Sequence, residues 1–210
     1  MTTIDQLQNR IICADCLDIL KQLPDKCVDL VLTDPPYGIG VNKMTMFDGA
    51  KQQKRHKEYN DVAPNIDIFN EIFRVSKNQI IWGGNYFIES LKNTRCFLIW
   101  DKIQNFSGSD FEMAWTSFDK CSKTFRLSRV EAYGDGTIHP TQKPISLFEW
   151  CLLNYSNEND LVLDCFSGSG TTAIACHNLK RRFICIERDK EYCEASIKRL
   201  EQAQRQQTLF

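Results

Sequence analysis

The chain has 210 residues, of which 42% are hydrophobic and 25% are charged, and its formal net charge is −1. This length predicts a single domain over residues 1–210 with room for a sizeable core. The near-neutral charge excludes a global attraction to polyanions, so any nucleic-acid binding must use local basic patches. The sequence has no run of the roughly 20 apolar residues that a membrane helix needs, and no secretory signal is visible at its start. We expect a cytoplasmic protein that does not bind membranes.

The ten cysteines lie mostly inside apolar runs. Cys165 and Cys185 fall in predicted buried strands, where a free thiol behaves as a small hydrophobic group. Cys13 and Cys16 form a C-x-x-C pair, but there is no second pair at zinc-site spacing and no nearby histidine. We interpret the cysteines as reduced structural thiols and expect no metal site.

Strand-like and helix-like segments alternate along the chain. The predicted strands cover residues 10–15, 27–33, 79–82, 96–100, 111–118, 124–127, 161–164 and 183–187. The predicted helices cover residues 17–23, 66–75, 144–155, 171–179 and 189–204, and apolar residues recur at helical spacing in 66–75 and 144–155. This alternation predicts an α/β fold with a doubly wound sheet. Residues 38–60 are basic and lack an apolar period, so we expect a mobile loop there.

A glycine-rich turn follows the predicted strand at 161–164, in the sequence D-C-F-S-G-S-G-T-T of residues 164–172. Gly168 and Gly170 remove side chains where a ligand must approach the backbone. Thr171 and Thr172 then begin a helix whose free N–H groups favour a negative group. The pattern predicts a cofactor site at this turn.

Two further acidic residues end predicted strands. Glu187 can accept two hydrogen bonds from the hydroxyls of a ribose. Asp15 either receives an adenine amino group or caps the helix that follows it, and both interpretations stay open. A dinucleotide-dependent oxidoreductase is the rival class, but the turn lacks the third glycine of G-x-G-x-x-G.

The tetrapeptide Asp34-Pro35-Pro36-Tyr37 directly follows the predicted strand at 27–33. Asp34 and the Pro35 carbonyl can each accept one hydrogen bond from an amino group, and the prolines keep this arrangement rigid. The Tyr37 ring offers a face for stacking a base that has left the duplex. Exocyclic amines are poor nucleophiles, so a catalyst must orient the nitrogen lone pair and stabilise the cation that forms. A Pro-Pro turn with an incidental tyrosine is the alternative.

The order of these motifs resembles the amino-group DNA methyltransferases of the permuted beta type, in which D-P-P-Y precedes F-x-G-x-G. The resemblance covers nearly the whole chain and is carried by residues 14–17, 34–37, 139–144 (H-P-T-Q-K-P) and 166–170. It implies a circularly permuted, Rossmann-like methyltransferase fold with a mixed, mostly parallel sheet. It also implies S-adenosyl-L-methionine as cofactor and double-stranded DNA as substrate, as in restriction–modification enzymes.

The first residue of the tetrapeptide bears on the target base. By the resemblance, aspartate at position 34 favours adenine N6 over cytosine N4 as the methyl acceptor. Methylation of cytosine N4, methylation of adenine in RNA, and a non-catalytic subunit that binds the cofactor and helps to recognise DNA remain the alternatives.

The resemblance also implies roles for individual residues. The implied catalytic residues are Asp34, Pro35, Pro36 and Tyr37. Asp15 and Glu187 are expected at the adenosine, and Lys143 near the methionine end of the cofactor. The full implied cofactor-binding set is Asp15, Cys16, Asp34, Lys143, Asp164, Phe166, Gly168, Gly170, Thr171, Thr172 and Glu187. Residues 85–87 and 100–102 are expected to form pocket walls.

Two basic stretches are candidates for contact with DNA, although a solvated charged loop is the alternative for each. The expected nucleic-acid-binding residues are Tyr37, Lys43, Lys54, Arg55, Lys57, Lys123, Arg126 and Arg129. Larger relatives place a target-recognition region between Phe118 and His139. This chain has only the short segment 119–138 there, so we expect a small recognition site.

The last six residues, 205–210, form a tail that ends in Q-Q-T-L-F. This ending is similar to the Q-x-x-L-F peptides by which bacterial proteins dock on the replication sliding clamp. Leu209 and Phe210 would fill an apolar cleft in such a complex. A frayed polar tail is the alternative. Relatives of this kind are often dimers, so a homodimer is a further expectation.

Overall fold

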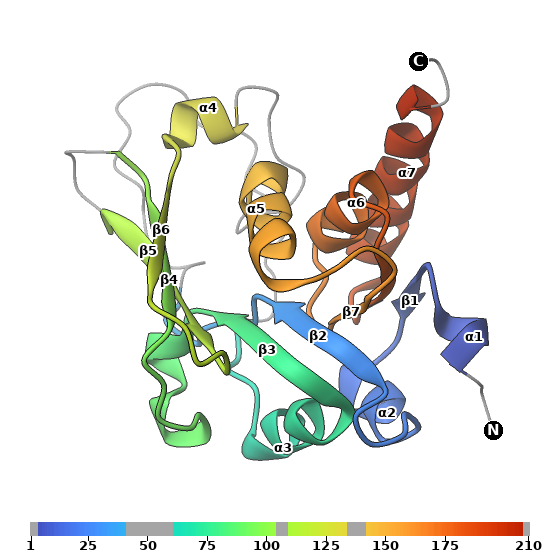
Figure 1. Cartoon of the computed structure of the whole chain (residues 1–210). Coiled ribbons are helices and arrows are strands. Elements are labelled where there is room, and N and C mark those ends of the chain that lie inside the picture. Colours follow the sequence, from blue (N-terminus) through green and yellow to red (C-terminus); the bar gives the residue numbers. More distant parts are fainter. Residues whose placement is uncertain (1–3, 41–60, 104–108, 134–141, 208–210) are drawn as a thin grey trace.

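The computed structural model describes residues 4–40, 61–103, 109–133 and 142–207 (Figure 1). Strands of the described part form one sheet in the spatial order β1-β8-β7-β2-β3-β5-β4-β6. The strands are β1 (Arg10–Cys13), β2 (Val28–Thr33), β3 (Ser76–Trp82), β4 (Phe97–Asp101), β5 (Phe111–Thr116), β6 (Lys123–Arg126), β7 (Leu161–Asp164) and β8 (Arg182–Glu187). The helices are α1 (Ile4–Leu7), α2 (Cys16–Leu20), α3 (Ile66–Val75), α4 (Arg129–Tyr133), α5 (Ile145–Tyr155), α6 (Thr171–Asn178) and α7 (Lys190–Gln207), with 3-10 turns η2 (Gly84–Tyr86) and η3 (Ile88–Ser90).

The sheet is mixed and mostly parallel, which confirms the predicted fold class. Strands β1, β8, β7, β2 and β3 are parallel to their neighbours in that series. Strand β5 is antiparallel to both β3 and β4, and β6 is parallel to β4. Because parallel strands end at a common edge, the segments that follow β1, β2, β7 and β8 converge there.

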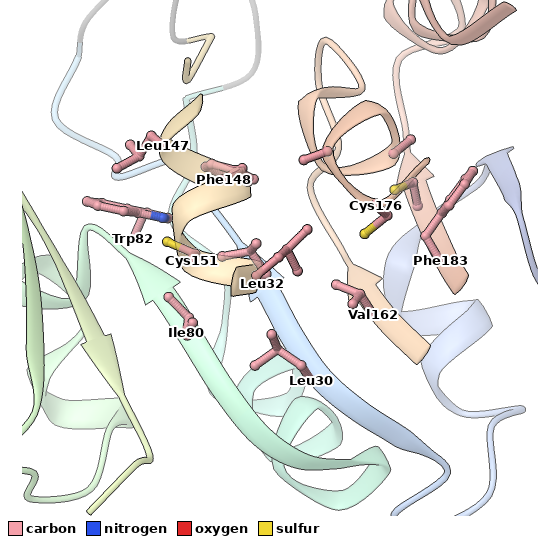
Figure 2. Packing of buried hydrophobic residues seen from close by; sticks show 14 of the residues in the cluster. Leu30, Leu32, Ile80, Trp82, Leu147, Phe148, Cys151, Val162, Cys176 and Phe183 are labelled. Carbon is pink, nitrogen blue, oxygen red and sulfur yellow. The ribbon is translucent and has the colours of Figure 1, made fainter. Parts of the chain in front are cut away.

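Helices cover both faces of the sheet: α2 and α3 lie on one side, and α5, α6 and α7 lie on the other (Figure 1). Leu30 and Leu32 of β2 belong to the cluster that α5 and α6 complete (Figure 2), whereas Val31 packs with residues of α2 and α3. Successive strand residues point to opposite faces, so a strand buried on both faces must be apolar throughout. This explains the continuous apolar character of β2.

The predicted elements agree with the observed ones to within about three residues at each end. Helix α3 has the predicted bounds because Asn65 caps it: the Asn65 side chain accepts a hydrogen bond from Ile68 N at 3.2 Å. The sequence analysis missed α1, α4, η2 and η3, which are too short for a periodic pattern. Within the predicted recognition segment, residues 123–126 form the edge strand β6 and residues 129–133 form α4.

Other expectations have mixed outcomes. All ten cysteines are free, and seven of them are buried. The basic residues Lys43, Lys54, Arg55 and Lys57 lie outside the described residues, as do residues 134–141 and 208–210. Helix α7 continues to Gln207, so the start of the expected tail is helical. No helix of the described part is long and apolar enough to cross a membrane, and the same residues contain no cluster of three potential metal-binding side chains.

Candidate active site

Four acidic residues meet at the carboxyl edge of the parallel strands. Asp15 follows β1, Asp34 follows β2, Asp164 ends β7 and Glu187 ends β8. All four line one pocket of about 590 Å³, and Phe166 lines it as well. The structure therefore places the tetrapeptide carboxylate beside the glycine-rich turn.

Nearly all of the residues expected to bind the cofactor line this pocket, namely Asp15, Cys16, Asp34, Lys143, Asp164, Phe166, Gly168, Thr171, Thr172 and Glu187. Gly170 is not among the lining residues. Gly170 has a φ of 75°, and a Cβ on it would lie 2.9 Å from the Cβ of Ser196 in α7. Its lack of a side chain lets the turn pack closely against α7, and its expected contact with the cofactor stays a prediction.

Glu187 joins two turns at the pocket. One carboxylate oxygen accepts Gly168 N at 2.8 Å and the other accepts Asp189 N at 2.7 Å. Burial raises the pKa of Glu187, and these backbone N–H groups oppose the rise. Each carboxylate oxygen has a further lone pair available, so the side chain can still accept hydrogen bonds from ligand hydroxyls.

Asp15 serves as a helix cap at the pocket wall. Its side chain accepts a hydrogen bond from Leu17 N at 2.9 Å, at the start of α2. The residue also lines the pocket. Both interpretations left open by the sequence are compatible with this position.

Asp164 links the two motif-bearing turns. Its carboxylate accepts hydrogen bonds from the Thr33 hydroxyl at 2.7 Å, from Phe166 N at 3.0 Å and from the Thr172 hydroxyl. Burial raises the pKa of Asp164 to about 6, although these three donors oppose the rise. Because Thr33 directly precedes Asp34, the buried carboxylate holds the tetrapeptide against the glycine-rich turn.

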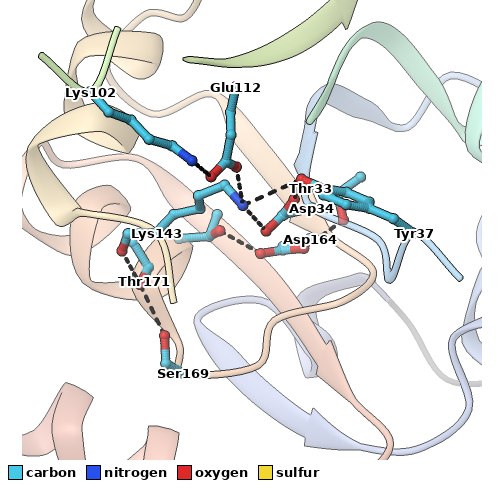
Figure 3. Close-up of polar contacts among 10 residues, drawn as sticks. Thr33, Asp34, Tyr37, Lys102, Glu112, Lys143, Asp164, Ser169 and Thr171 are labelled. Carbon is cyan, nitrogen blue, oxygen red and sulfur yellow. Dashed lines mark hydrogen bonds and ion pairs between the residues drawn. The ribbon is translucent and has the colours of Figure 1, made fainter. Parts of the chain in front are cut away.

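Asp34 is the end of a chain of four alternating charges (Figure 3). Its Oδ2 pairs with Lys143 Nζ at 2.5 Å, and its Oδ1 accepts the Tyr37 hydroxyl at 2.6 Å. Lys143 Nζ also lies 2.9 Å from Glu112 Oε2, and Glu112 Oε1 lies 2.8 Å from Lys102 Nζ. Both lysines are buried, so the chain Lys102–Glu112–Lys143–Asp34 crosses the protein interior to reach the pocket.

The charges in this chain stabilise one another. Burial alone would raise the pKa of Glu112, but Lys143 and Lys102 lower it to about 2. Burial alone would lower the pKa of Lys143, but Asp34 and Glu112 outweigh that effect and raise it. Burial raises the pKa of Asp34, and the attraction of Lys143 limits the rise. Lys143 and Glu112 are consequently charged at neutral pH.

Glu112 was not among the residues expected at the site. The residue sits in β5 between Phe111 and Met113, in a strand that is otherwise largely apolar. A single charge inside an apolar strand was the available signal. Lys102 was expected only as part of a pocket wall.

The Tyr37 ring, expected to offer a face for stacking a base, already has an aromatic neighbour. Its ring stacks on Tyr86 at a centroid distance of 4.7 Å and an interplanar angle of 19°. Gly83 also confines the ring, because a Cβ at this glycine would lie 2.0 Å from Tyr37 Cε1. The side chain of Tyr86 is itself about half exposed. The two tyrosines form a paired aromatic surface, and neither of them lines the 590 Å³ pocket.

The described basic residues of the second stretch lie at the edge of the sheet. On β6, Lys123 Nζ donates to Asn154 Oδ1 at 2.8 Å, and Arg126 pairs with Asp101 at 3.0 Å. Arg129 begins α4. Their positions are compatible with contact to a large ligand beyond β6.

Comparison with known proteins gives consistent results. A family model described as DNA methylase matches residues 90–198. The Type II methyltransferase M.HinfI of Haemophilus influenzae is 27% identical over 257 residues, which cover 94% of this chain and 69% of the relative. The Type II methyltransferase M2.MboI of Moraxella bovis is 28% identical over 232 residues, covering 88% of this chain and 85% of the relative.

Solved structures are similar over most of the chain. The crystal structure of the M1.HpyAVI–SAM complex has a TM-score of 0.60 at 27% identity, and the match covers 91% of this chain and 99% of that one. The PvuII DNA methyltransferase (cytosine-N4-specific) has a TM-score of 0.62 at 19% identity, covering 90% and 85%. The second likeness concerns the fold alone.

Proposed function

The chain belongs to the family of amino-group DNA methylases, and we propose that it transfers a methyl group from S-adenosyl-L-methionine to N6 of adenine in double-stranded DNA. Membership of this family implies a DNA methyltransferase that uses this cofactor. The choice of adenine rests on aspartate as the first residue of the tetrapeptide at 34–37.

One observation carries the proposal: Asp34 lines the same pocket as Glu187 and the glycine-rich turn. The pocket volume of about 590 Å³ lies within the range of sites for ligands of this size. Glu187 retains lone pairs for the ribose hydroxyls, and Gly168 leaves the backbone open beside it. The residues present therefore fit the cofactor, which supplies an electrophilic methyl group.

The tetrapeptide acts on the methyl acceptor. Asp34 and the Pro35 carbonyl accept the two hydrogens of the exocyclic amino group, which directs the nitrogen lone pair toward the pocket. The nitrogen would become positively charged as it accepted the methyl group, and Asp34 would stabilise this charge until the nitrogen released one of its protons to solvent. The base leaves the duplex to reach the site and stacks on the aromatic surface of Tyr37 and Tyr86.

A methylation assay with identified products tests the proposal. The protein is incubated with unmethylated double-stranded DNA and labelled S-adenosyl-L-methionine, and the digested nucleosides are analysed by mass spectrometry. We expect N6-methyladenine. N4-methylcytosine would replace the adenine proposal with its rival, and preferential labelling of competing RNA would replace the substrate. An absence of methylated nucleosides despite cofactor binding would refute a catalytic role.

The variant Asp34→Ala serves as the control for this assay. We expect it to lose methyl transfer and to keep most of its cofactor affinity in a calorimetric titration, because Gly168 follows β7 and Glu187 ends β8, whereas Asp34 follows β2. Unchanged transfer in Asp34→Ala would refute the catalytic role of Asp34. Sequencing methylated DNA from cells that express the wild-type protein would then identify the recognition site.

Contacts with DNA at Lys123, Arg126 and Arg129 are part of the proposal. Replacing the three residues by alanine should weaken DNA binding and make it less dependent on salt, since each phosphate contact adds to the salt slope. Docking of the C-terminal tail on a sliding clamp and formation of a homodimer stay predictions. Clamp retention after deletion of the last five residues, and the molar mass in solution, test these two predictions.

A further inference from the structure

The Asp34 carboxylate is already engaged on both of its oxygens. Tyr37 donates to one oxygen at 2.6 Å, and the Lys143 ammonium contacts the other at 2.5 Å. A target amino group must approach this same carboxylate if the proposed function holds. A neutral amine is a weaker donor than an ammonium group, so Lys143 competes directly with the substrate.

Glu112 offers Lys143 a second acceptor. The Lys143 ammonium lies 2.9 Å from Glu112 Oε2, so it can bond to Glu112 while it leaves Asp34. Lys102 holds the other oxygen of Glu112 at 2.8 Å, which fixes the carboxylate in place. Figure 3 shows Lys143 between the two acidic side chains.

Glu112 and Lys102 do not line the pocket, whereas Lys143 and Asp34 do. Glu112 therefore contacts the pocket through Lys143, and its charge acts in addition on Asp34 by raising the pKa of that carboxylate. Lys102 is buried, and the side chain of Glu112 is 24% exposed.

We propose that Glu112 is a positioning residue that takes over the Lys143 ammonium when the target amino group binds to Asp34. The inference rests on the proposed function of Asp34 as the acceptor of that amino group. Lys143 changes its main hydrogen-bond acceptor and remains protonated, so the step transfers no proton.

Moving Lys143 from Asp34 to Glu112 reduces the repulsion between its ammonium group and the positive charge that develops on the substrate. The amino nitrogen becomes cationic during methylation, and an ammonium group still bound to Asp34 would repel it. Glu112 both draws Lys143 aside and offsets its charge. In the empty site the charge of Lys143 opposes the rise that burial causes in the pKa of Asp34.

A double-mutant cycle measures the dependence of Glu112 on Lys143. We expect Glu112→Gln to lower kcat about tenfold or more and to leave cofactor affinity unchanged. A loss of this size corresponds to the interaction free energies measured between contacting charged residues. Lys143→Met should keep a measurable single-turnover rate. In the Lys143→Met background, Glu112→Gln should cost less than about twofold because no ammonium is left to displace.

The pH profile of kcat gives a second readout that a merely structural role would not move. Asp34 faces Tyr37, Lys143 and Glu112, and it also interacts with the charge of Asp164. Glu112 raises the pKa of Asp34 and Lys143 lowers it. Removing the Glu112 charge should therefore shift the acid limb to lower pH, and Lys143→Met should shift it to higher pH.

Asp29→Asn is the matched control. Asp29 lies near the start of β2, whereas Asp34 follows the end of this strand. The Asp29 carboxylate pairs with Lys77 Nζ at 2.7 Å. We expect this variant to change neither kcat nor the acid limb. Circular dichroism and calorimetric cofactor binding establish that each variant is folded.

Several outcomes would overturn the inference. They are an equal loss from Glu112→Gln in both backgrounds, an unmoved acid limb, and complete loss of transfer in Lys143→Met. If Lys143→Met does not fold, Glu112→Asp decides: it must recover part of the rate lost in Glu112→Gln, and no recovery contradicts the role. A wild-type protein that binds the cofactor but never methylates DNA would instead refute the proposed function itself.

Discussion

Replacing Gly83 by alanine tests whether the Tyr37 ring must stay where the structure places it. Gly83 has a φ of 67°, and an added Cβ would lie 2.0 Å from Tyr37 Cε1 and 2.5 Å from its Cζ. The ring cannot easily yield, because its hydroxyl is bonded to Asp34 and its face stacks on Tyr86. The added methyl group can therefore be accommodated only if Tyr37 gives up these two contacts, which costs stability.

The expected loss of stability has two parts. Alanine in the left-handed backbone conformation costs about 1–2 kcal/mol, and an overpacked side chain costs about 1–3 kcal/mol more. Gly40 provides a matched control, because its φ is 72° and no atom of the residues that the structure describes lies within 4 Å of a Cβ there. Gly40→Ala should show only the backbone part, so the difference between the two variants isolates the clash with the ring.

The expected effect on activity follows from the lost stacking of the base. Stacking on an aromatic ring contributes about 1–3 kcal/mol, so kcat/KM for DNA should fall about 5-fold to 150-fold in Gly83→Ala. Cofactor affinity should stay the same because Tyr37 does not line the pocket. Urea unfolding, methylation kinetics and calorimetry measure the three quantities. Equal unfolding free energies and equal rates for Gly83→Ala and Gly40→Ala would refute the reasoning.

Three further variants probe the pocket. Glu187→Gln should raise the Kd of the cofactor about tenfold in calorimetry, because it weakens the hydrogen bonds that this side chain accepts from Gly168 N and from the ligand. An unchanged Kd would contradict this expectation. Asp164 has a pKa of about 6 in the folded protein, above that of a free aspartate. Its contribution to the free energy of unfolding is therefore greatest below about pH 4, and about 3 kcal/mol of it is lost as the pH rises through 6. Urea unfolding at pH 5 and pH 8 should show a smaller pH dependence in Asp164→Asn than in wild type. Arg199→Met removes the hydrogen bond to Ser169 O at 3.0 Å, which should lower the unfolding free energy by about 1–3 kcal/mol, and full stability would argue against this role.

Much of the fold could be predicted because local patterns specify it. Strands such as β7 and β8 are short apolar runs that end in an acidic residue, and α3 carries its own cap at Asn65. The convergence of Asp34 with Glu187 follows from the parallel arrangement that these patterns imply.

The remaining features depend on pairings between distant segments. Glu112 reaches Lys143 because β5 lies beside β3 in antiparallel register, with Trp82 opposite Ala114. Nothing local to residues 111–116 reveals that register. The role of Gly170 likewise depends on Ser196, which belongs to a helix that begins 20 residues later.

The position of β2 in the sheet has a consequence for synthesis on the ribosome. Its two neighbours are β3, which follows soon after, and β7, which is translated about 130 residues later. The separation in sequence is even larger between β1 and its partner β8. A nascent chain therefore carries open strand edges that invite aggregation until β7 and β8 emerge. The pocket, which Asp164 and Glu187 line, cannot form before residue 187 has been translated.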